Sequence, residues 1–351
     1  MKTLAVLTSG GDAPGMNTAI VSATKVATAR GWRVVGVQNG YDGLIAGNFQ
    51  QLGPAEVDDW WQRGGTCLGS ARSPAFRTPE GRAEAARNLH GIDALIVIGG
   101  NGSLAGAHAL SQEQDVPVVG IPASIDNDIA CTSTAIGVDT ALNTIVEACD
   151  RIADTARSHR RVFIVEVMGR ECGYLAMAGS IATAADAVIF REQGKSEDQL
   201  VAELREVIRR SFSAARDKRR VLIIKAEGVD VPTERLATRL EATVAKDAPG
   251  VNIRWSVLGH MVRGGSPSFR DRSIAGRLAF AAVNAVADGH FGTMVGWTDE
   301  HGAGRKTADP KVSLHPLETV LAQTVTLLDG THPTTQRRLR MLEAVQGVLP
   351  L

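Results

Sequence analysis

Short apolar runs rich in β-branched residues alternate along the chain with longer segments whose apolar residues recur at helical spacing. The segments predict helices at about residues 16–29, 140–159, 197–215, 233–246 and 272–288. The runs predict strands that begin near Thr3, Trp32, Asp93, Val116, Arg161, Arg220 and Asn252. Strands that alternate with helices are typical of βα units around a mostly parallel sheet, so we expect an α/β protein. Beyond Thr331 the segment "TTQRRLRMLEAVQG" has a helical pattern, but the sequence does not indicate how it packs.

Several predicted strands end in glycine or polar residues instead of a tight hairpin turn. These ends read "TSGGDAPGMN", "IGGNGS", "IPASIDND", "VMGRECG" and "LGHMVRGGSP". A single loop of this kind is better explained as a tight βα turn. Because open α/β sheets bind ligands at the carboxyl ends of their strands, the five loops together favour a shared ligand site there.

Composition and charge narrow the classes of protein to consider. The 351 residues are enough for about two domains at roughly 150 residues each. The 38 basic residues balance the 38 acidic ones, so no overall field favours nucleic acid or an anionic membrane. Any anion site must therefore be built locally.

The cysteines and the first residues predict a cytoplasmic protein without a membrane partner. Cys67, Cys131, Cys149 and Cys172 show no CxxC spacing, which favours free thiols in a reducing compartment. The apolar run "LAVL" near the start is too short for a signal-peptide core. No apolar run approaches the roughly 20 residues that cross a bilayer.

Two glycine-rich loops are candidates for holding phosphate. "SGGDAPG" follows the first predicted strand, and Gly10 and Gly11 let backbone N–H groups approach an anion beside a helix N-terminus. It matches neither the Walker loop nor the GxGxxG fingerprint. "RGGTCLGSAR" ends in Arg72, whose guanidinium could clamp phosphate oxygens, although a solvated surface loop explains the same residues.

"PASIDND" carries the most specific chemistry. If the segment is extended, Asp126 and Asp128 alternate along it and face one site, with Asn127 turned away. One carboxylate could then act as a base for a hydroxyl and the other could support a metal. An Asx-rich turn that only satisfies backbone groups is the alternative.

Five basic residues lie at or near ends of predicted strands. Each by itself is explained as a solvated flank, but together they could surround a phosphorylated substrate. They are Arg161, Arg170, Arg254, His260 and Arg263.

The ordered strings "LTSGGDAPGMN", "RGGTCLGSAR", "GGNGS", "SIDND", "VEVMGRECGY" and "VLGHMVRGGSP" resemble the 6-phosphofructokinases as far as about residue 275. The resemblance implies the glycolytic transfer of the γ-phosphate of a nucleotide to the 1-hydroxyl of fructose 6-phosphate. It implies two similar three-layer lobes with mostly parallel sheets. Residues 1–138 with 251–305 would bind the nucleotide, and residues 139–250 with 306–351 the sugar phosphate. It also implies a homotetramer.

The resemblance assigns roles to individual residues. Asp126 would be the base, Asp128 would support the metal and the loop, Ser124 would lie beside the transferring group, and Arg170 would stabilise its charge. The donor phosphates would be held by Gly11, Arg72, Gly100, Asn101, Gly102 and Ser103. The sugar phosphate would be bound by Met168, Gly169, Arg170, Glu227, His260 and Arg263, and by Arg161 and Arg254 of a neighbouring subunit.

Three positions bear on the donor and the metal. Pyrophosphate-dependent members carry Asp and Lys where this chain has Gly102 and Ala123, so the resemblance points to ATP. Asn101 replaces the Asp that most ATP-dependent members place near Mg²⁺, which predicts weaker metal binding at Asn101, Asp126 and Asp128. The alternatives are a pyrophosphate-dependent or other sugar-phosphate kinase, or a non-catalytic subunit that senses sugar phosphate.

A further departure concerns regulation. Where bacterial members place arginines around ADP or phosphoenolpyruvate, this chain has Val21, Pro54 and Ala153, although Lys25 keeps one charge. We expect weak or absent control by those two anions, because the guanidinium forks that would hold them are missing.

Overall fold

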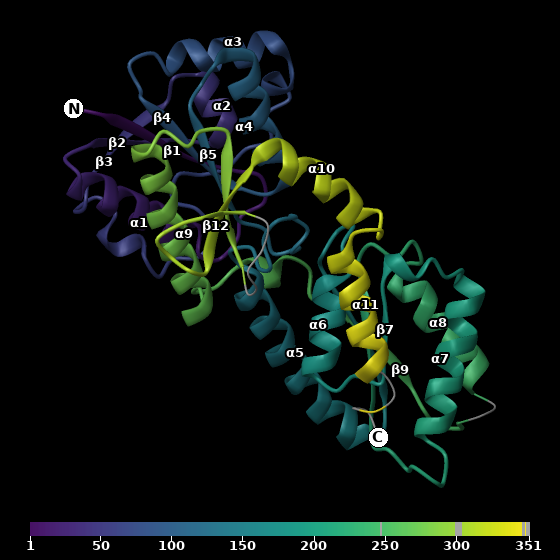
Figure 1. Ribbon diagram of the computed structural model, residues 1–351. Coiled ribbons are helices and arrows are strands. Elements are labelled where there is room, and N and C mark those ends of the chain that lie inside the picture. The colour runs from purple at the N-terminus through teal and green to yellow at the C-terminus, as the bar shows by residue number, and fades with distance from the viewer. Residues whose placement is uncertain (246–247, 299–303, 346–347, 349–351) are drawn as a thin grey trace. The chain divides into compact units, whose positions relative to one another are not determined.

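The computed structural model describes residues 1–245, 248–298, 304–345 and 348 (Figure 1). The chain divides into two compact units. The first comprises Met1–Thr140 and Arg263–Thr326, and the second comprises Ala141–Val262 and Leu327–Leu351.

The first unit is built on an eight-stranded sheet in the order β11-β12-β10-β5-β4-β1-β2-β3. The strands are β1 (Thr3–Ser9), β2 (Arg33–Val37), β3 (Phe49–Leu52), β4 (Ala94–Gly99), β5 (Val118–Pro122), β10 (Thr293–Trp297), β11 (Arg305–Lys306) and β12 (Val312–Pro316). The central strands run parallel, while β3, β12 and β11 pair antiparallel at the edges. The carboxyl ends of β1, β4 and β5 therefore lie next to one another.

Helices cover both faces of this sheet (Figure 1). On one face α1 (Met16–Ala29) packs against α9 (Phe269–Ala287). The other face carries α2 (Gly40–Ile45), α3 (Pro79–Asn88) and α4 (Asn101–Gln114), with the short helices η1 (Asp58–Trp60) and η2 (Ala75–Arg77) in the connections. Ten residues of α1 are buried, because the helix lies between the sheet and α9.

The second unit has a four-stranded, wholly parallel sheet in the order β7-β8-β6-β9. Its strands are β6 (Val162–Val167), β7 (Ala187–Ile189), β8 (Val221–Ala226) and β9 (Ile253–Val257). Its helices are α6 (Tyr174–Ala182), α7 (Glu197–Ser211), α8 (Thr233–Val244) and α11 (Pro333–Val345), with η3 (Arg191–Gln193). Helices α7 and α8 close one apolar core, and α11 packs on α6 (Figure 1). Helices α5 (Val138–His159) and α10 (Leu317–Leu328) and the short η4 (Gly259–Arg263) cross the unit boundary.

The α/β class with mostly parallel sheets is confirmed, as are the seven predicted strands and five predicted helices. Helix α7 ends at Ser211, earlier than predicted, and the predicted end of α8 at residue 246 lies outside the described residues. The tail is helical over Pro333–Val345. Helices α2, α3, α4, α6 and α10 and strands β3, β7, β10, β11 and β12 were not predicted. The segment of α4, "NGSLAGAHALSQEQ", has only weak apolar periodicity.

The unit boundaries differ from the predicted lobes in two long segments, and residues 139–140 also fall in the first unit instead of the second. Residues 251–262 belong to the second unit, because β9 pairs with β6. Residues 306–326 belong to the first, because β12 pairs with β10. The predicted lobes also included 246–247, 299–303, 346–347 and 349–351, which lie outside the described residues.

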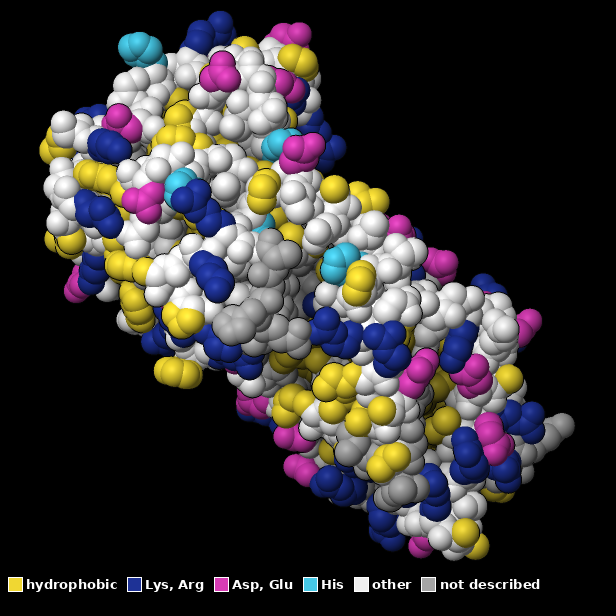
Figure 2. Space-filling model, in the orientation of Figure 1, with side chains coloured by type: hydrophobic (Ala, Val, Ile, Leu, Met, Phe, Trp, Pro, Cys, Tyr) yellow, Lys and Arg dark blue, Asp and Glu magenta, His cyan; other side chains and the backbone are white. Residues whose placement is uncertain are grey.

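Acidic and basic side chains are interspersed on the face shown in Figure 2, in keeping with the balanced composition. Within the described ranges, no helix combines the length and apolar character needed to cross a membrane.

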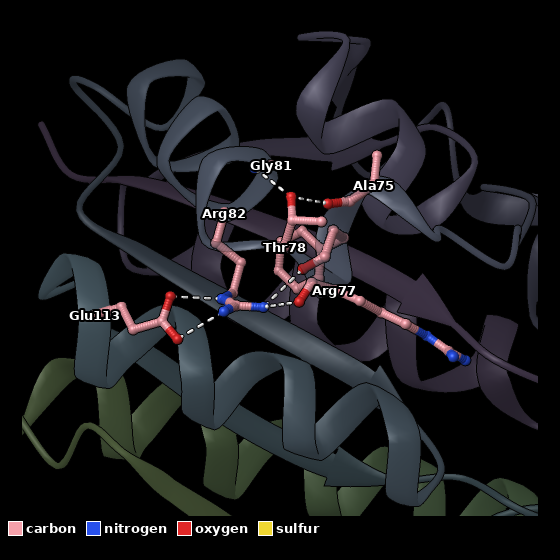
Figure 3. A network of polar contacts seen from close by, with 7 residues as sticks. Ala75, Arg77, Thr78, Gly81, Arg82 and Glu113 are labelled. Carbon is pink, nitrogen blue, oxygen red and sulfur yellow. Dashed lines mark hydrogen bonds and ion pairs between the residues drawn. The ribbon is translucent and has the colours of Figure 1, made fainter.

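Arg82 on α3 fastens the segment that precedes this helix (Figure 3). Its Nε and Nη2 donate to the two carboxylate oxygens of Glu113 on α4, at 2.6 and 2.7 Å. Its Nη1 donates to the carbonyls of Phe76 and Arg77, at 3.0 and 2.8 Å. Thr78 adds a cap, because its Oγ1 accepts from Gly81 N at 3.1 Å and donates to the Ala75 carbonyl.

We expect Arg82→Met to lower the free energy of unfolding by about 2 kcal/mol, because it leaves two carbonyls and the Glu113 carboxylate without their donor. Urea denaturation measures this. Arg87→Met is the matched control: its side chain on the same helix is 69% exposed and pairs with Glu84. That pair is expected to contribute less than about 1 kcal/mol. Equal losses in both variants would contradict this account of Arg82.

Candidate functional site

The loop after β1 is a glycine-rich turn with a cation beside it. Gly10 has a φ of +85° and Gly15, at the start of α1, a φ of +107°, conformations that favour glycine. A Cβ at Gly11 would lie 2.6 Å from Nη1 of Arg263, so this guanidinium lies directly against the loop. The same nitrogen donates to the Asp12 carbonyl at 3.2 Å. The structure thus places Arg263, predicted among the sugar-phosphate residues, at the predicted donor loop.

The loop over residues 63–72 is tied to the β1 loop. Ser70 Oγ donates to the Gly10 carbonyl at 2.6 Å, and Asn17 of α1 accepts from Cys67 N at 2.7 Å. Arg72 follows Ser70 by two residues and is exposed. The two glycine-rich loops, which were predicted as separate candidates, therefore lie next to each other at one site.

The first turn of α4 lies beside these loops and is open at one position. A Cβ at Gly10 would lie 3.0 Å from Ser103 Oγ, which shows how closely the turn approaches the β1 loop. A Cβ at Gly102 would have no heavy atom within 4 Å. Gly100 caps the helix, and Asn101 is its first residue.

Tyr41 supports this turn, and sequence analysis missed it. Its hydroxyl donates to the Ser103 carbonyl at 2.6 Å, and its ring stacks on Phe76 at 3.8 Å between centroids. Burial raises the pKa of the Tyr41 phenol well above its usual range, so the group stays a donor. Its contact with Ser103 joins residues 62 positions apart, for which the sequence holds no local signal.

The loop after β5 carries the carboxylates. It is a turn, not the extended segment expected: Asn127 has a φ of +50° and is fully buried. Its side chain donates to the Ser133 carbonyl at 3.2 Å and accepts from Ala135 N at 3.1 Å. Asn127 therefore organises the turn, and Asp126 and Asp128 flank it.

Ser124, Asp128 and Asn101 form one hydrogen-bonded group. Ser124 Oγ donates to Asp128 Oδ1 at 3.0 Å, and Asn101 Nδ2 donates to Asp128 Oδ2 at 2.8 Å. Ser124 Oγ also accepts from the backbone N of Asp126, whose side chain is 5% exposed. The structure thus brings the predicted base, the predicted metal-supporting residues and the first turn of α4 together.

The oxygen atoms of this group suit a hard cation. The two polar atoms of the Asn101 amide differ. Nδ2 donates to Asp128, whereas Oδ1 is buried and has no hydrogen-bond partner among the described residues. Carboxylate and amide oxygens are ligands that Mg²⁺ accepts. No group of three or more His, Cys, Asp or Glu side chains in the described part of the chain could hold a metal alone. A cation here would therefore need further oxygens from its phosphate ligand.

The second unit collects Met168, Gly169, Arg170 and Glu227 at the carboxyl ends of β6 and β8. Glu227 Oε1 accepts from the backbone N of Gly169 at 3.2 Å and of Arg170 at 2.7 Å. Gly169 has a φ of +142° and Arg170 one of +48°, a region that non-glycine residues seldom occupy. Glu227 thus holds a strained loop whose arginine is exposed.

Arg161 and Arg254 lie at the opposite end of the same sheet. Arg161 precedes β6, and Arg254 pairs with Phe163, the second residue of that strand. Met168 follows the other end of β6, about 20 Å along a six-residue strand. Within a single chain, these two arginines are therefore too far from Glu227 to share a site with it. His260, exposed in η4, follows the carboxyl end of β9.

A buried lysine two residues before Glu227 was also missed. Lys225 Nζ lies 3.0 Å from Glu166 Oε2, and Thr233 Oγ1 donates to the same oxygen. The side chain of Lys225 is 1% exposed and that of Glu166 19%, so the ion pair is largely buried in the second unit. The sequence did contain a signal for this residue, because a lysine inside the apolar run "VLIIKAE" indicates a buried cation.

Comparisons with known proteins give the chain its relatives. The family described as Phosphofructokinase matches residues 3–286. An ATP-dependent 6-phosphofructokinase 2 of Bacteroides thetaiotaomicron is 44% identical over 298 residues, 84% of this chain and 89% of that protein. An ATP-dependent 6-phosphofructokinase of Thermotoga petrophila is 45% identical over 297 residues, with the same coverage.

A solved phosphofructokinase of Saccharomyces cerevisiae superposes with a TM-score of 0.84 at 32% identity. The match covers 99% of this chain but spans only half the length of the yeast chain. The family match takes in both units and the loops after β1, β4 and β5 described above. The chain therefore belongs to the phosphofructokinase family.

Proposed function

We propose that this chain transfers the γ-phosphoryl group of ATP to the 1-hydroxyl of fructose 6-phosphate, giving fructose 1,6-bisphosphate and ADP. The observation that carries the proposal is the group formed by Ser124, Asp126, Asp128 and Asn101 beside the open first turn of α4. Relatives at 44 and 45% identity are named ATP-dependent 6-phosphofructokinases, which supports both the reaction and the donor. The chemistry is that of a cytoplasmic glycolytic enzyme.

Asp126 acts as the general base in this proposal. The 1-hydroxyl oxygen forms a bond to the γ-phosphorus, the bond to the ADP oxygen breaks, and the hydroxyl proton passes to Asp126. Ser124 holds Asp126 by its backbone N at 3.3 Å and orients Asp128 at 3.0 Å. Positioning and charge stabilisation supply most of the catalysis in phosphoryl transfer, and Arg170 provides a positive charge for it.

Mg²⁺ suits the oxygen atoms of Asn101, Asp126 and Asp128, and when bound it neutralises charge on the donor phosphates. Gly11, Arg72, Gly100 and Ser103 hold the donor in this proposal. The open space at Gly102 leaves room for the α-phosphate of a nucleotide. Ala123, fully buried beside Ile136, offers no cation in place of that phosphate. Both positions favour ATP over pyrophosphate.

Replacing Asn101 with Asp should lower the Mg²⁺ concentration for half-maximal activity several-fold, because a carboxylate adds charge to the cation site. Without metal the variant should unfold at a lower temperature, since the new carboxylate would lose the 2.8 Å donor contact to Asp128 and face its charge. Titrating Mg²⁺ in activity and thermal-unfolding assays tests both effects. Unchanged metal dependence would contradict the proposed role of Asn101.

We propose that Met168, Gly169, Arg170, Glu227, His260 and Arg263 bind the sugar phosphate, and that Arg161 and Arg254 of a second copy complete the site in a homotetramer. Arg161 and Arg254 lie at the far end of their own sheet, so they serve another subunit's site more readily than their own. Strand β9 is a sheet edge with Trp255 41% and Val257 56% exposed. Exposed apolar edges favour contact with another chain.

Phosphoenolpyruvate should leave the saturation curve for fructose 6-phosphate unshifted. Val21 is fully buried, Pro54 carries no charge, and Lys25 pairs with Asp58 at 3.0 Å. Initial rates at increasing phosphoenolpyruvate test this. A clear shift of the curve towards higher fructose 6-phosphate concentrations would show that phosphoenolpyruvate still binds near these residues. We propose that ADP likewise exerts only weak control at this position.

The acceptor is tested with 1-deoxyfructose 6-phosphate, which keeps the 6-phosphate and lacks the reacting hydroxyl. We expect it to compete with fructose 6-phosphate and to give no bisphosphate. Phosphorylation of this analogue would show that another hydroxyl reacts. Sedoheptulose 7-phosphate, assayed in parallel, distinguishes a broader sugar-phosphate kinase. A protein that binds fructose 6-phosphate without turning it over would be the sensing subunit.

A further inference from the structure

A cavity in the first unit shares no residue with the loops after β1, β4 and β5. It has a volume of about 370 Å³ and is lined by the second half of α9, the end of α1, the segment 305–309 and Leu314 of β12. Figure 1 shows α9 and β12 in the same unit, and the two elements are in contact. Its volume falls at the lower end of the range for small-molecule sites.

The cavity wall carries more positive than negative charge. Arg30, Arg305 and Lys306 contribute three cations, and no carboxylate in the described ranges forms an ion pair with any of them. Arg30 Nη2 instead donates to the neutral Asn284 Oδ1 at 2.5 Å. Arg305 Nη1 lies 3.5 Å from His290 Nδ1.

The acidic residues of the wall do not cancel this charge. Asp309 is held by both Nε and Nη2 of Arg277, at 2.6 and 2.5 Å, and that contact lowers the pKa of its carboxyl. Asp288 is the other acid of the wall and is exposed. The net charge favours an anion, and guanidinium groups bind phosphate oxygens in a forked geometry.

One wall of the cavity is apolar and includes an exposed aromatic ring. Phe280 is 48% exposed, whereas its neighbours in the wall, Ala281 and Ala285, are small and buried. Most phenylalanines are far more buried, and an exposed ring beside cations suits a ligand that combines a flat ring with an anion.

We propose that this cavity binds a nucleoside monophosphate, with the phosphate among Arg30, Arg305 and Lys306 and the base on Phe280. The limited volume favours one base, one sugar and one phosphate over a larger dinucleotide. The site is distinct from the proposed donor site, because it is built on the second half of α9 and on β11, not on the loops after β1, β4 and β5.

Hydrogen–deuterium exchange of the full chain with AMP locates the binding. AMP is expected to slow exchange in peptides covering 280–290 and 304–314, in addition to any protection of 9–15 and 99–104 at the donor loops. Ribose 5-phosphate, which has the phosphate but no base, is expected to protect 280–290 and 304–314 less at the same concentration. Protection by AMP at the donor loops alone would overturn the proposal, as would equal protection by ribose 5-phosphate.

Matched variants test the residues. Lys306→Ser should raise the AMP concentration for half-maximal protection of 304–314 about tenfold, whereas Lys311→Ser, the same change outside the cavity wall, should change it less than twofold. Phe280→Leu should raise this AMP concentration about fivefold. Phe291→Leu, which changes another partly exposed ring outside the cavity wall, should leave it unchanged. Equal effects within either pair would show that the cavity is not the binding site.

Discussion

Replacing Asp126 with Asn should lower kcat by a factor on the order of 10² to 10⁴, with the KM for fructose 6-phosphate changed only a few-fold. The amide has nearly the same shape as the carboxylate but cannot accept the hydroxyl proton. The side chain is 5% exposed and its backbone N is held by Ser124 Oγ, so the loop should keep its conformation. Steady-state kinetics with ATP and Mg²⁺ measure the effect.

Asp115→Asn is the matched control for this variant. Asp115 is exposed at the end of α4 and has a φ of +53°, a conformation that Asn also tolerates. Its activity should match that of the unchanged protein within about twofold, and both variants should unfold at the same temperature. If Asp126→Asn retained most of its kcat, another group would have to be the base.

Replacing Gly102 with Asp should lower kcat/KM for ATP about 10²-fold or more. A Cβ at this position meets no heavy atom within 4 Å, so a side chain can start here without a clash at Cβ. A carboxylate in the first turn of α4 is also compatible with the helix dipole. The loss would therefore come from repulsion between the new carboxylate and the donor phosphates, since like charges in contact cost several kcal/mol.

Gly102→Asn separates charge from size in the same position. Asn has nearly the volume of Asp without its charge, so the loss should be less than about tenfold, with unchanged thermal unfolding. If Asn and Asp lowered kcat/KM equally, bulk and not charge would decide the donor at Gly102. If neither variant lost activity, the first turn of α4 would not contact the donor.

The sequence predicted those parts of the site that local pattern determines. Strands β1, β4 and β5 are apolar runs, and the polar residues after them necessarily meet at one edge of a parallel sheet. This placed Gly11 and Asp126 at the same edge. The conformation of the turn itself was predicted wrongly, because the left-handed φ of Asn127 depends on its contacts to Ser133 and Ala135.

Long-range contacts set the features that the sequence could not supply. The unit boundary depends on the pairing of β9 with β6 and of β12 with β10, which no local pattern encodes. The approach of Arg263 to Gly11 joins residues about 250 positions apart. The bond from Asn101 to Asp128 likewise appears only when α4 and the β5 loop are placed together.

The measurement that tests the central claim most directly is formation of fructose 1,6-bisphosphate by the purified protein with Mg²⁺, fructose 6-phosphate and either ATP or pyrophosphate. The account predicts turnover with ATP and none with pyrophosphate, because Gly102 leaves open space and Ala123 carries no charge. Turnover with pyrophosphate alone would contradict the assignment of the donor. Silence with both donors, in a folded protein that still binds fructose 6-phosphate, would contradict the proposed activity itself.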